Sequence, residues 1–241
     1  NYFGVCGGCK LQNYEYGKQI EYKTNVVKNA FERIGGFKDL VIPEAIRSDD
    51  VFFYRNKMEF SFSDDEWVTE KDINIERERF ALGLHVPKFH SKIINIEKCF
   101  LQSELSNSIL NFTRDFFKKK NISVYSTKTQ SGFLRFLIIR QSKNTNDLMV
   151  NLITYEKNDD IIKEYADQLK SNHTSITTVI NSITQKKAQV ATGESENILY
   201  GSGFIYEKLR TPSGGEYLFK ISPQSFFQTN TLQAEKLFNI V

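Results

Sequence analysis

The sequence predicts an α+β protein whose central domain is built on an antiparallel sheet. Apolar and polar residues alternate in several short stretches, as they do in strands that bury one face. These stretches follow one another at hairpin distance, and only a few helical stretches interrupt them. Hydrophobic residues make up 40% of the 241 residues and charged residues 25%, which is typical of a globular protein.

The first expected element is a helix over residues 13–34. Asn13 can cap its start, and Gly35 with Gly36 stops it. Its apolar residues at helical spacing are Tyr16, Ile20, Val27, Phe31 and Ile34.

The middle of the chain then changes to a period of two, with large apolar residues at every second position. The expected strands with this pattern lie at residues 58–62, 80–84, 134–138 and 148–152. Helices are expected near residues 103–119 and 160–171, and further strands at 175–183 and 198–209.

The glycine- and proline-containing turn at residues 211–215 marks an expected domain boundary. A short strand (217–221) and a helix from about Asn230 follow. Because the apolar face of that helix has no partner in the remaining sequence, we expect it to open a further domain. The predicted units are a cysteine-rich segment with a helix (1–40), a central α+β domain (41–215) and the truncated start of a third domain (216–241).

Charge and targeting signals limit the function classes only loosely. The net charge of +3 is weak evidence for a polyanionic partner, and clusters of basic residues are more often solvated surface. No apolar run is long enough to span a membrane, and no signal peptide is visible. Three cysteines without a secretion signal argue against a disulfide framework, so we expect a cytoplasmic protein.

The cysteines form the most specific pattern in the chain. Cys6 and Cys9 flank two glycines, so both thiols can reach one metal centre, and Cys99 can supply a third ligand. Inert buried cysteines remain an alternative. A structural zinc site, with His90 or His85 as the fourth ligand, is another.

Four segments, in order, resemble the iron–sulfur-containing RNA (uracil-5-)-methyltransferase family, of the 23S ribosomal RNA 5-methyluridine type. No segment alone is decisive, but together they extend over nearly the whole chain. They are Phe3–Gln12, Tyr54–Phe60, Gly83–His85 with Ile96–Cys99, and Ile221–Asn230.

The resemblance implies a [4Fe–4S] cluster with Cys6, Cys9 and Cys99 as ligands. The family's spacing puts the fourth thiolate one residue before Asn1, so this chain departs from the pattern and the cluster could be absent from it. The resemblance also implies S-adenosylmethionine as methyl donor, with Gln228 contacting it, and Phe226 packed beside a flipped target base. The alternative for Phe226 is that it anchors the following helix in a core, and for Phe227 this core role is the favoured interpretation.

The resembled enzymes attack uracil C6 with a cysteine thiolate, methylate C5 and remove the C5 proton with a base. All three cysteines are assigned to the cluster, and no glycine-rich donor loop follows a strand. We therefore expect the fragment to be inactive alone, with the nucleophile, the base and a Rossmann-like donor domain lying outside it.

RNA binding is the function that the fragment can retain. A basic sheet face interleaved with aromatic rings offers phosphate contacts together with base stacking. The candidate RNA contacts are Arg55, Lys57, Arg135 and Arg140, beside Phe53, Tyr54 and Phe133. Ribosomal RNA is the expected partner rather than transfer RNA, without a membrane or an obligate protein partner. Alternatives are a non-catalytic RNA-binding module and a zinc-stabilised interaction domain.

Overall fold

The computed structural model of the chain describes residues 2–68 and 79–240, and their main element is a seven-stranded sheet with the strand order β3-β2-β1-β4-β5-β6-β7. All neighbouring strands are antiparallel except β5 and β6, which are parallel and are connected through helix α3 (Asp159–Asn172). The expected α+β class with a mostly antiparallel sheet is therefore confirmed. The strands are β1 (Lys57–Ser63), β2 (Ala81–Val86), β3 (Phe89–Asn95), β4 (Leu134–Gln141), β5 (Leu148–Thr154), β6 (Thr178–Ile183) and β7 (Ser195–Tyr200).

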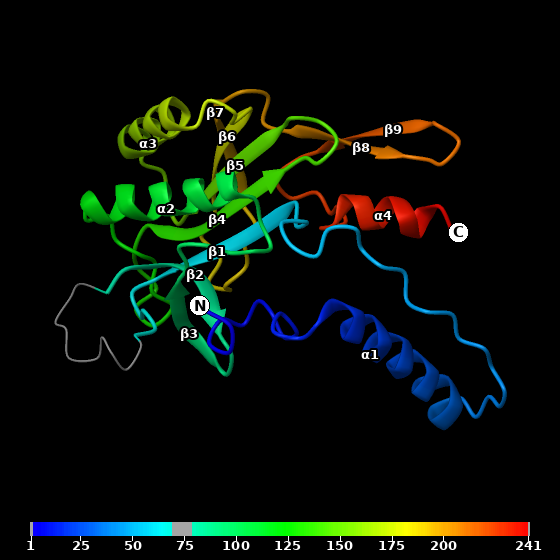
Figure 1. Ribbon diagram of the computed structural model, residues 1–241. Coiled ribbons are helices and arrows are strands. Elements are labelled where there is room, and N and C mark those ends of the chain that lie inside the picture. Colours follow the sequence, from blue (N-terminus) through cyan, green and yellow to red (C-terminus); the bar gives the residue numbers. More distant parts are fainter. Residues whose placement is uncertain (1, 69–78, 241) are drawn as a thin grey trace.

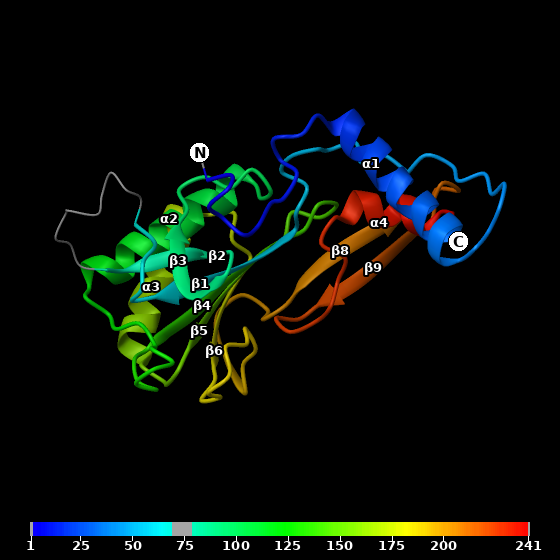
Figure 2. The same cartoon turned by 90° about the horizontal axis from the view of Figure 1, so that it is seen from below.

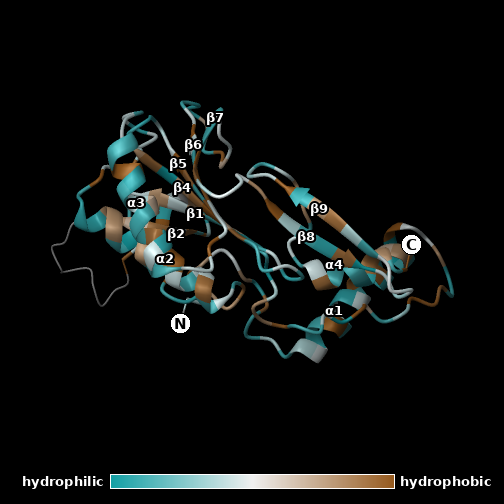
Figure 3. Cartoon of the chain, turned by 90° about the horizontal axis from the view of Figure 1, so that it is seen from above, coloured by the Kyte–Doolittle hydropathy of each residue, from teal (hydrophilic) through white to brown (hydrophobic). Residues whose placement is uncertain are grey.

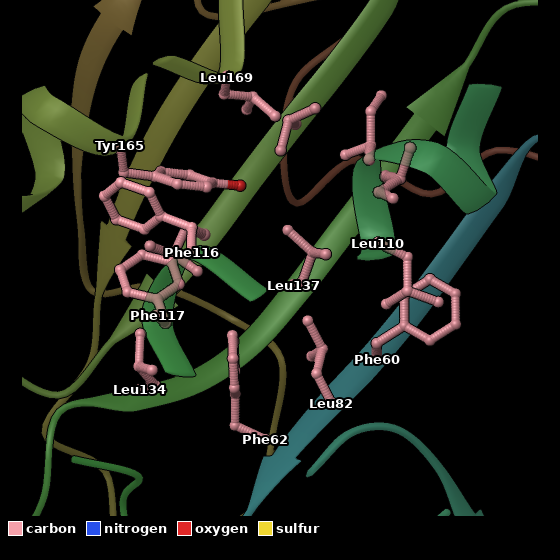
Figure 4. Packing of buried hydrophobic residues seen from close by; sticks show 14 of the residues in the cluster. Phe60, Phe62, Leu82, Leu110, Phe116, Phe117, Leu134, Leu137, Tyr165 and Leu169 are labelled. Atoms are coloured by element: carbon pink, nitrogen blue, oxygen red, sulfur yellow. The ribbon is translucent and has the colours of Figure 1, made fainter. Parts of the chain in front are cut away.

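Helices α2 (Glu104–Lys119) and α3 cover one face of this sheet (Figure 1). Ser103 and Asn158 cap them by accepting hydrogen bonds from the backbone N–H groups of Ser106 and Ile161. Their buried sides meet the sheet in the main core, where Leu137 lies among aromatic and aliphatic side chains from both layers (Figure 4). Hydrophobic residues follow the strands of the sheet in the hydropathy view (Figure 3).

Strands β4 and β5 are buried on both faces, although their alternation predicted only one buried face. The second face is covered by the chain segments that return across it. Two small clusters result, one of Phe136, Ile138 and Ile153 beside Ala191, and one of Met149, Ile180, Ile205 and Ile221 beside Phe227. Central strands that are covered on both sides keep few solvent-facing positions.

The expected strand at residues 198–209 is two strands. β7 ends at Tyr200, and β8 (Ile205–Arg210) begins after a turn in which Gly201 and Gly203 have positive φ angles of 76° and 79°. β8 pairs with β9 (Glu216–Ile221) in a hairpin that extends away from the sheet (Figures 1 and 2). Residues 211–215, where a domain boundary is expected, form the turn of this hairpin.

Helix α1 (Tyr16–Asn29) and a π-helical turn (Ala30–Ile34) match the predicted first helix, but Asn13 is not its cap, because the helix begins after Glu15. α1 lies outside the sheet layers, on the side of helix α4 (Thr231–Phe238) (Figures 1 and 2). It buries only Ile20 and is held through the 45–48 segment, where Thr24 Oγ1 accepts from Ala45 N. In the described ranges, no helix has the length and apolar character that crossing a membrane requires.

The sheet–helix core should dominate the stability of the protein. Leu137 is fully buried, so Leu137→Ala should lower the free energy of unfolding by about 2–5 kcal/mol in chemical denaturation. Leu218 on β9 is 61% exposed, and Leu218→Ala should change the same quantity by less than about 0.5 kcal/mol. Equal losses in the two variants would contradict this location of the core.

Candidate functional site

Asn56 joins two segments that are far apart in the sequence. Its side-chain amide donates hydrogen bonds to Gln228 O and Thr231 Oγ1, each at 2.8 Å, and its backbone N–H donates to Thr229 O at 2.8 Å. Gln141 N on β4 donates to Asn56 O at 2.8 Å. The start of β1 thereby fixes the path of residues 228–231 against the end of β4.

The second fixed point of this junction is the buried carboxylate of Glu207 on β8. It is 1% exposed and accepts from Thr231 Oγ1 at 2.8 Å, from Ser142 Oγ at 2.7 Å and from Lys143 N at 2.8 Å. These charge-assisted hydrogen bonds compensate the removal of the carboxylate from water. The turn after β4, the hairpin and the start of α4 therefore meet at one charged group.

Arg140 was expected on an RNA-binding surface, and the structure corrects this expectation. The residue is 3% exposed, and its guanidinium donates to Pro223 O at 3.3 Å and to Ser225 O. Burial lowers the pKa of this guanidinium, whereas the charge of Glu59 raises it. Because it is committed to two backbone carbonyls, Arg140 positions the 222–227 segment.

The segment that Arg140 and Asn56 hold presents Phe226 at a pocket of about 370 Å³. Phe226 is 85% exposed, while the neighbouring Phe227 packs onto Phe219 with ring centroids 5.7 Å apart. The open question for these two rings is thus answered differently for each. Phe227 is a core residue, and Phe226 is free to contact another molecule.

Basic side chains line the same pocket. Arg55 uses its Nε to donate to Lys57 O at 2.9 Å, and in the described part of the chain its terminal nitrogens carry no such bond. Lys57 forms an ion pair with Glu59 and also lines the pocket. Arg55 and Lys57, the RNA contacts that the sequence predicts, therefore line the same pocket as Phe226. The buried Arg140 also lines this pocket.

Arg135 does not belong to this pocket. It is 2% exposed, lies over the ring of Tyr125 at 4.4 Å and donates to the carbonyls of Thr184, Lys186 and Ala188. Phe133 is buried as well. Because both faces of β4 are covered, the expected basic and aromatic sheet face does not form, and Arg135 instead ties the 184–188 segment to β4.

Gln228 is an exposed residue. Its backbone carbonyl accepts from Asn56, and the residue lines a different pocket of about 400 Å³ with Ile46, Gln233 and Leu237. The resemblance assigns Gln228 to the methyl donor and Phe226 to the target uracil. In the structure, Phe226 and Gln228 line two different pockets, although they are two residues apart in the segment that follows β9.

The three cysteines line a single small pocket, although Cys99 is 90 residues away from Cys9 in the sequence. Gly7 donates its N–H to His85 O at 3.0 Å, and a Cβ on Gly7 would lie 2.8 Å from that oxygen. Only glycine therefore lets this loop approach β2 so closely. Gly8 N donates to Cys6 Sγ at 3.4 Å.

Burial raises the pKa of the Cys6 and Cys9 thiols, and the nearby Cys99 thiol adds to both shifts. Asn107 on α2 fixes the Cys99 peptide: its Oδ1 accepts from Cys99 N at 2.8 Å and its Nδ2 donates to Cys99 O at 3.1 Å. Sequence reasoning missed Asn107, because an asparagine inside an amphipathic helix carries no motif.

No three His, Cys, Asp or Glu side chains of the described residues are arranged as a ready metal site. His85, considered for zinc, lies 3.1 Å from Ser61 Oγ through its Nε2 and does not line the cysteine pocket. The side chain of His90, the other zinc candidate, lies outside what the structure describes.

Backbone hydrogen bonds connect the loop after Cys99 to the segment that leads into the Phe226 pocket. Phe53 N donates to Phe100 O at 2.7 Å and Arg55 N donates to Leu101 O at 2.8 Å. The loop that follows Cys99 therefore holds the backbone of Arg55, directly before Asn56.

Comparisons with known proteins bear on this arrangement. A scan against known protein families finds no match. The chain is 36% identical over 98% of its length to a sequence named an uncharacterized RNA methyltransferase of Chlorobaculum tepidum. It is 34% identical over 99% of its length to one of Bacteroides thetaiotaomicron with the same description. It covers 49% and 53% of these relatives, so it spans about half of their length.

Among solved structures, the chain resembles the Pyrococcus abyssi tRNA (uracil-54, C5)-methyltransferase in complex with S-adenosyl-L-homocysteine. The TM-score is 0.69 at 29% identity, over 97% of this chain and 50% of that one. The chain is thus similar in sequence to about half of each of these two relatives, and in sequence and fold to half of this solved structure.

Proposed function

We propose that this chain is the RNA-binding half of an S-adenosylmethionine-dependent enzyme that methylates uracil C5 in RNA. One observation carries the proposal: Phe226 is 85% exposed on a backbone that Asn56 and Arg140 hold, beside the cations Arg55 and Lys57. An exposed ring next to cations suits an extruded base, whose lost stacking it replaces while the cations contact phosphates. The RNA methyltransferase relatives and the uracil-specific solved structure support the same reaction.

In this proposal the chain binds and presents the base, and other parts of the enzyme perform the transfer. No cysteine lines the Phe226 pocket within the described residues, so the thiolate that attacks C6 comes from elsewhere. The chain covers about half of its relatives, which leaves room for the nucleophile, the base and a donor domain. Gln228 lies at the edge of that donor site, since its pocket opens beside α4.

We further propose that Cys6, Cys9 and Cys99 are three ligands of a [4Fe–4S] cluster. Three soft thiols around one pocket, with an amide N–H directed at one sulfur, fit the donor chemistry of such a cluster. The fourth thiolate would come from a position before Asn1. A bound cluster would tie the N-terminal loop to the Cys99 loop, and so brace the backbone of Arg55.

The choice of RNA is part of the proposal. Ribosomal RNA is the substrate that the cysteine motif favours, whereas the solved relative acts on a tRNA. A cytoplasmic location fits either substrate.

Arg55 should contact RNA phosphate. Arg55→Ala should weaken binding of single-stranded, uridine-containing RNA and reduce the slope of log Kd against log salt by about one, because one phosphate contact is lost. Fluorescence anisotropy at several salt concentrations measures both quantities. Lys119→Ala, an exposed lysine at the end of α2, is the matched control and should leave the slope unchanged. An unaltered slope in Arg55→Ala would refute the phosphate contact.

Phe226 and Phe227 should separate binding from stability. Phe226→Ala should weaken RNA binding about 5- to 100-fold through lost stacking, with unchanged unfolding free energy. Phe227→Ala should instead lower the unfolding free energy by about 1–3 kcal/mol. Anisotropy and chemical denaturation on both variants check this, and a stability loss in Phe226→Ala with intact RNA affinity would reverse the assignment.

The cluster proposal predicts a coloured protein. When the chain is extended upstream through the fourth cysteine and purified without oxygen, we expect visible sulfur-to-iron absorption with stoichiometric iron and sulfide. Cys99→Ser should remove most of both, and chelation of the metal should lower the melting temperature because two loops lose their link. A colourless protein with stoichiometric zinc would exclude the cluster.

A further inference from the structure

We propose that a second nucleotide of the bound RNA strand, adjacent to the one at Phe226, occupies the cavity between the cysteine loop, α1 and the 45–55 segment. This inference rests on the proposed function, because it requires RNA to be bound at the Phe226 pocket. It adds a base-binding site next to the Phe226 pocket and to the pocket that Gln228 lines.

The cavity has the size and lining that a nucleotide needs. Its volume is about 560 Å³, within the range of about 300–1,000 Å³ for small-ligand pockets. The rings of Phe52, Tyr14 and Tyr54 line it, together with the cations Lys10 and Lys23. Phe52 is 45% exposed and meets Phe100 edge to face at 6.0 Å, so one face of its ring can stack on a base.

Gln233 on α4 supplies a polar side chain to this cavity. Its Nε2 donates to Ile46 O at 3.2 Å, which fixes the orientation of the amide, because the reverse orientation would set two oxygens against each other. Its Oε1 is buried and has no hydrogen-bond partner among the described residues, and Gln233 lines both this cavity and the pocket of Gln228. A buried acceptor of this kind is stabilised by an N–H donor, which a nucleobase carries on its Watson–Crick edge.

The cavity is adjacent to the Phe226 pocket. Gly8, Arg55 and Leu101 line both hollows, so the two sites share a wall. Arg55 belongs to this shared wall, and its charge can attract the phosphate between two successive nucleotides that pass there. One strand can therefore place one base beside Phe226 and its neighbour beside Phe52.

The charges at the cavity favour a nucleotide over a free anion. Asp50 also lines it, and a carboxylate there would repel a phosphate placed deep inside. It can accept a hydrogen bond from a ribose hydroxyl or a base amino group. The base and sugar would thus lie inside, with phosphates at the cationic rim.

Abasic scanning of a short single-stranded RNA tests this arrangement. In the wild-type protein, removing a base at either of two adjacent positions should weaken binding about 5- to 100-fold, measured by anisotropy. Phe226→Ala should become insensitive to base removal at one position, and Phe52→Ala at the other. Tyr22→Ala, an exposed tyrosine of α1 that does not line the cavity, should keep the wild-type pattern.

The outcomes separate the two proposals. Sensitivity at a single position in the wild-type protein, or an unchanged two-position pattern in Phe52→Ala, would overturn the second site and leave the proposed function intact. Absence of RNA binding by the wild-type protein would overturn both. Loss of one position in each variant supports both.

Discussion

The hydrogen bonds of the Asn56 amide to Gln228 O and Thr231 Oγ1 are the constraint on which the proposed site depends. They connect residues 172 and 175 positions apart, and the bond to Thr231 is buried, where the low dielectric strengthens it. The Thr231 hydroxyl in turn donates a hydrogen bond to the carboxylate of Glu207. Without its hydrogen-bond donors, burial of this carboxylate would be unfavourable. The order of the 222–231 segment is therefore a property of the whole junction.

In the proposed function, the same junction would let the cysteine pocket affect RNA binding without taking part in the chemistry. Asn107 fixes the Cys99 peptide, the next residues pair with Phe53 and Arg55, and Asn56 follows directly. Anything that orders the Cys99 loop thereby also orders Arg55 and the wall between the two pockets. A cluster in this position would act as a brace, which agrees with methyl transfer needing no electron.

Much of the fold could be predicted from the sequence, because α2, α3 and the strands β1, β4 and β5 have strong local periodicity. The split of residues 198–209 into two strands and the hairpin across 211–215 could not, since both depend on which strands pair. The same limit applied to the site. Phe226 and Arg55 belong to short sequence motifs, so a local pattern was enough to select them as candidates. The burial of Arg135 and Arg140 depends on distant segments, residues 184–191 and 222–227, which return across β4.

Arg55 and Arg140 show that the role of an arginine side chain depends on its position in the fold. Arg140 lies within β4, where the sheet is covered, and its guanidinium donates hydrogen bonds to the backbone carbonyls of Pro223 and Ser225. Arg55 lies just before β1, at the rim, where only its Nε is used within the described chain. The buried arginine fixes the segment that carries Phe226, and the rim arginine remains available to a phosphate. A basic cluster in a sequence therefore indicates an RNA surface only when the chain leaves that surface uncovered.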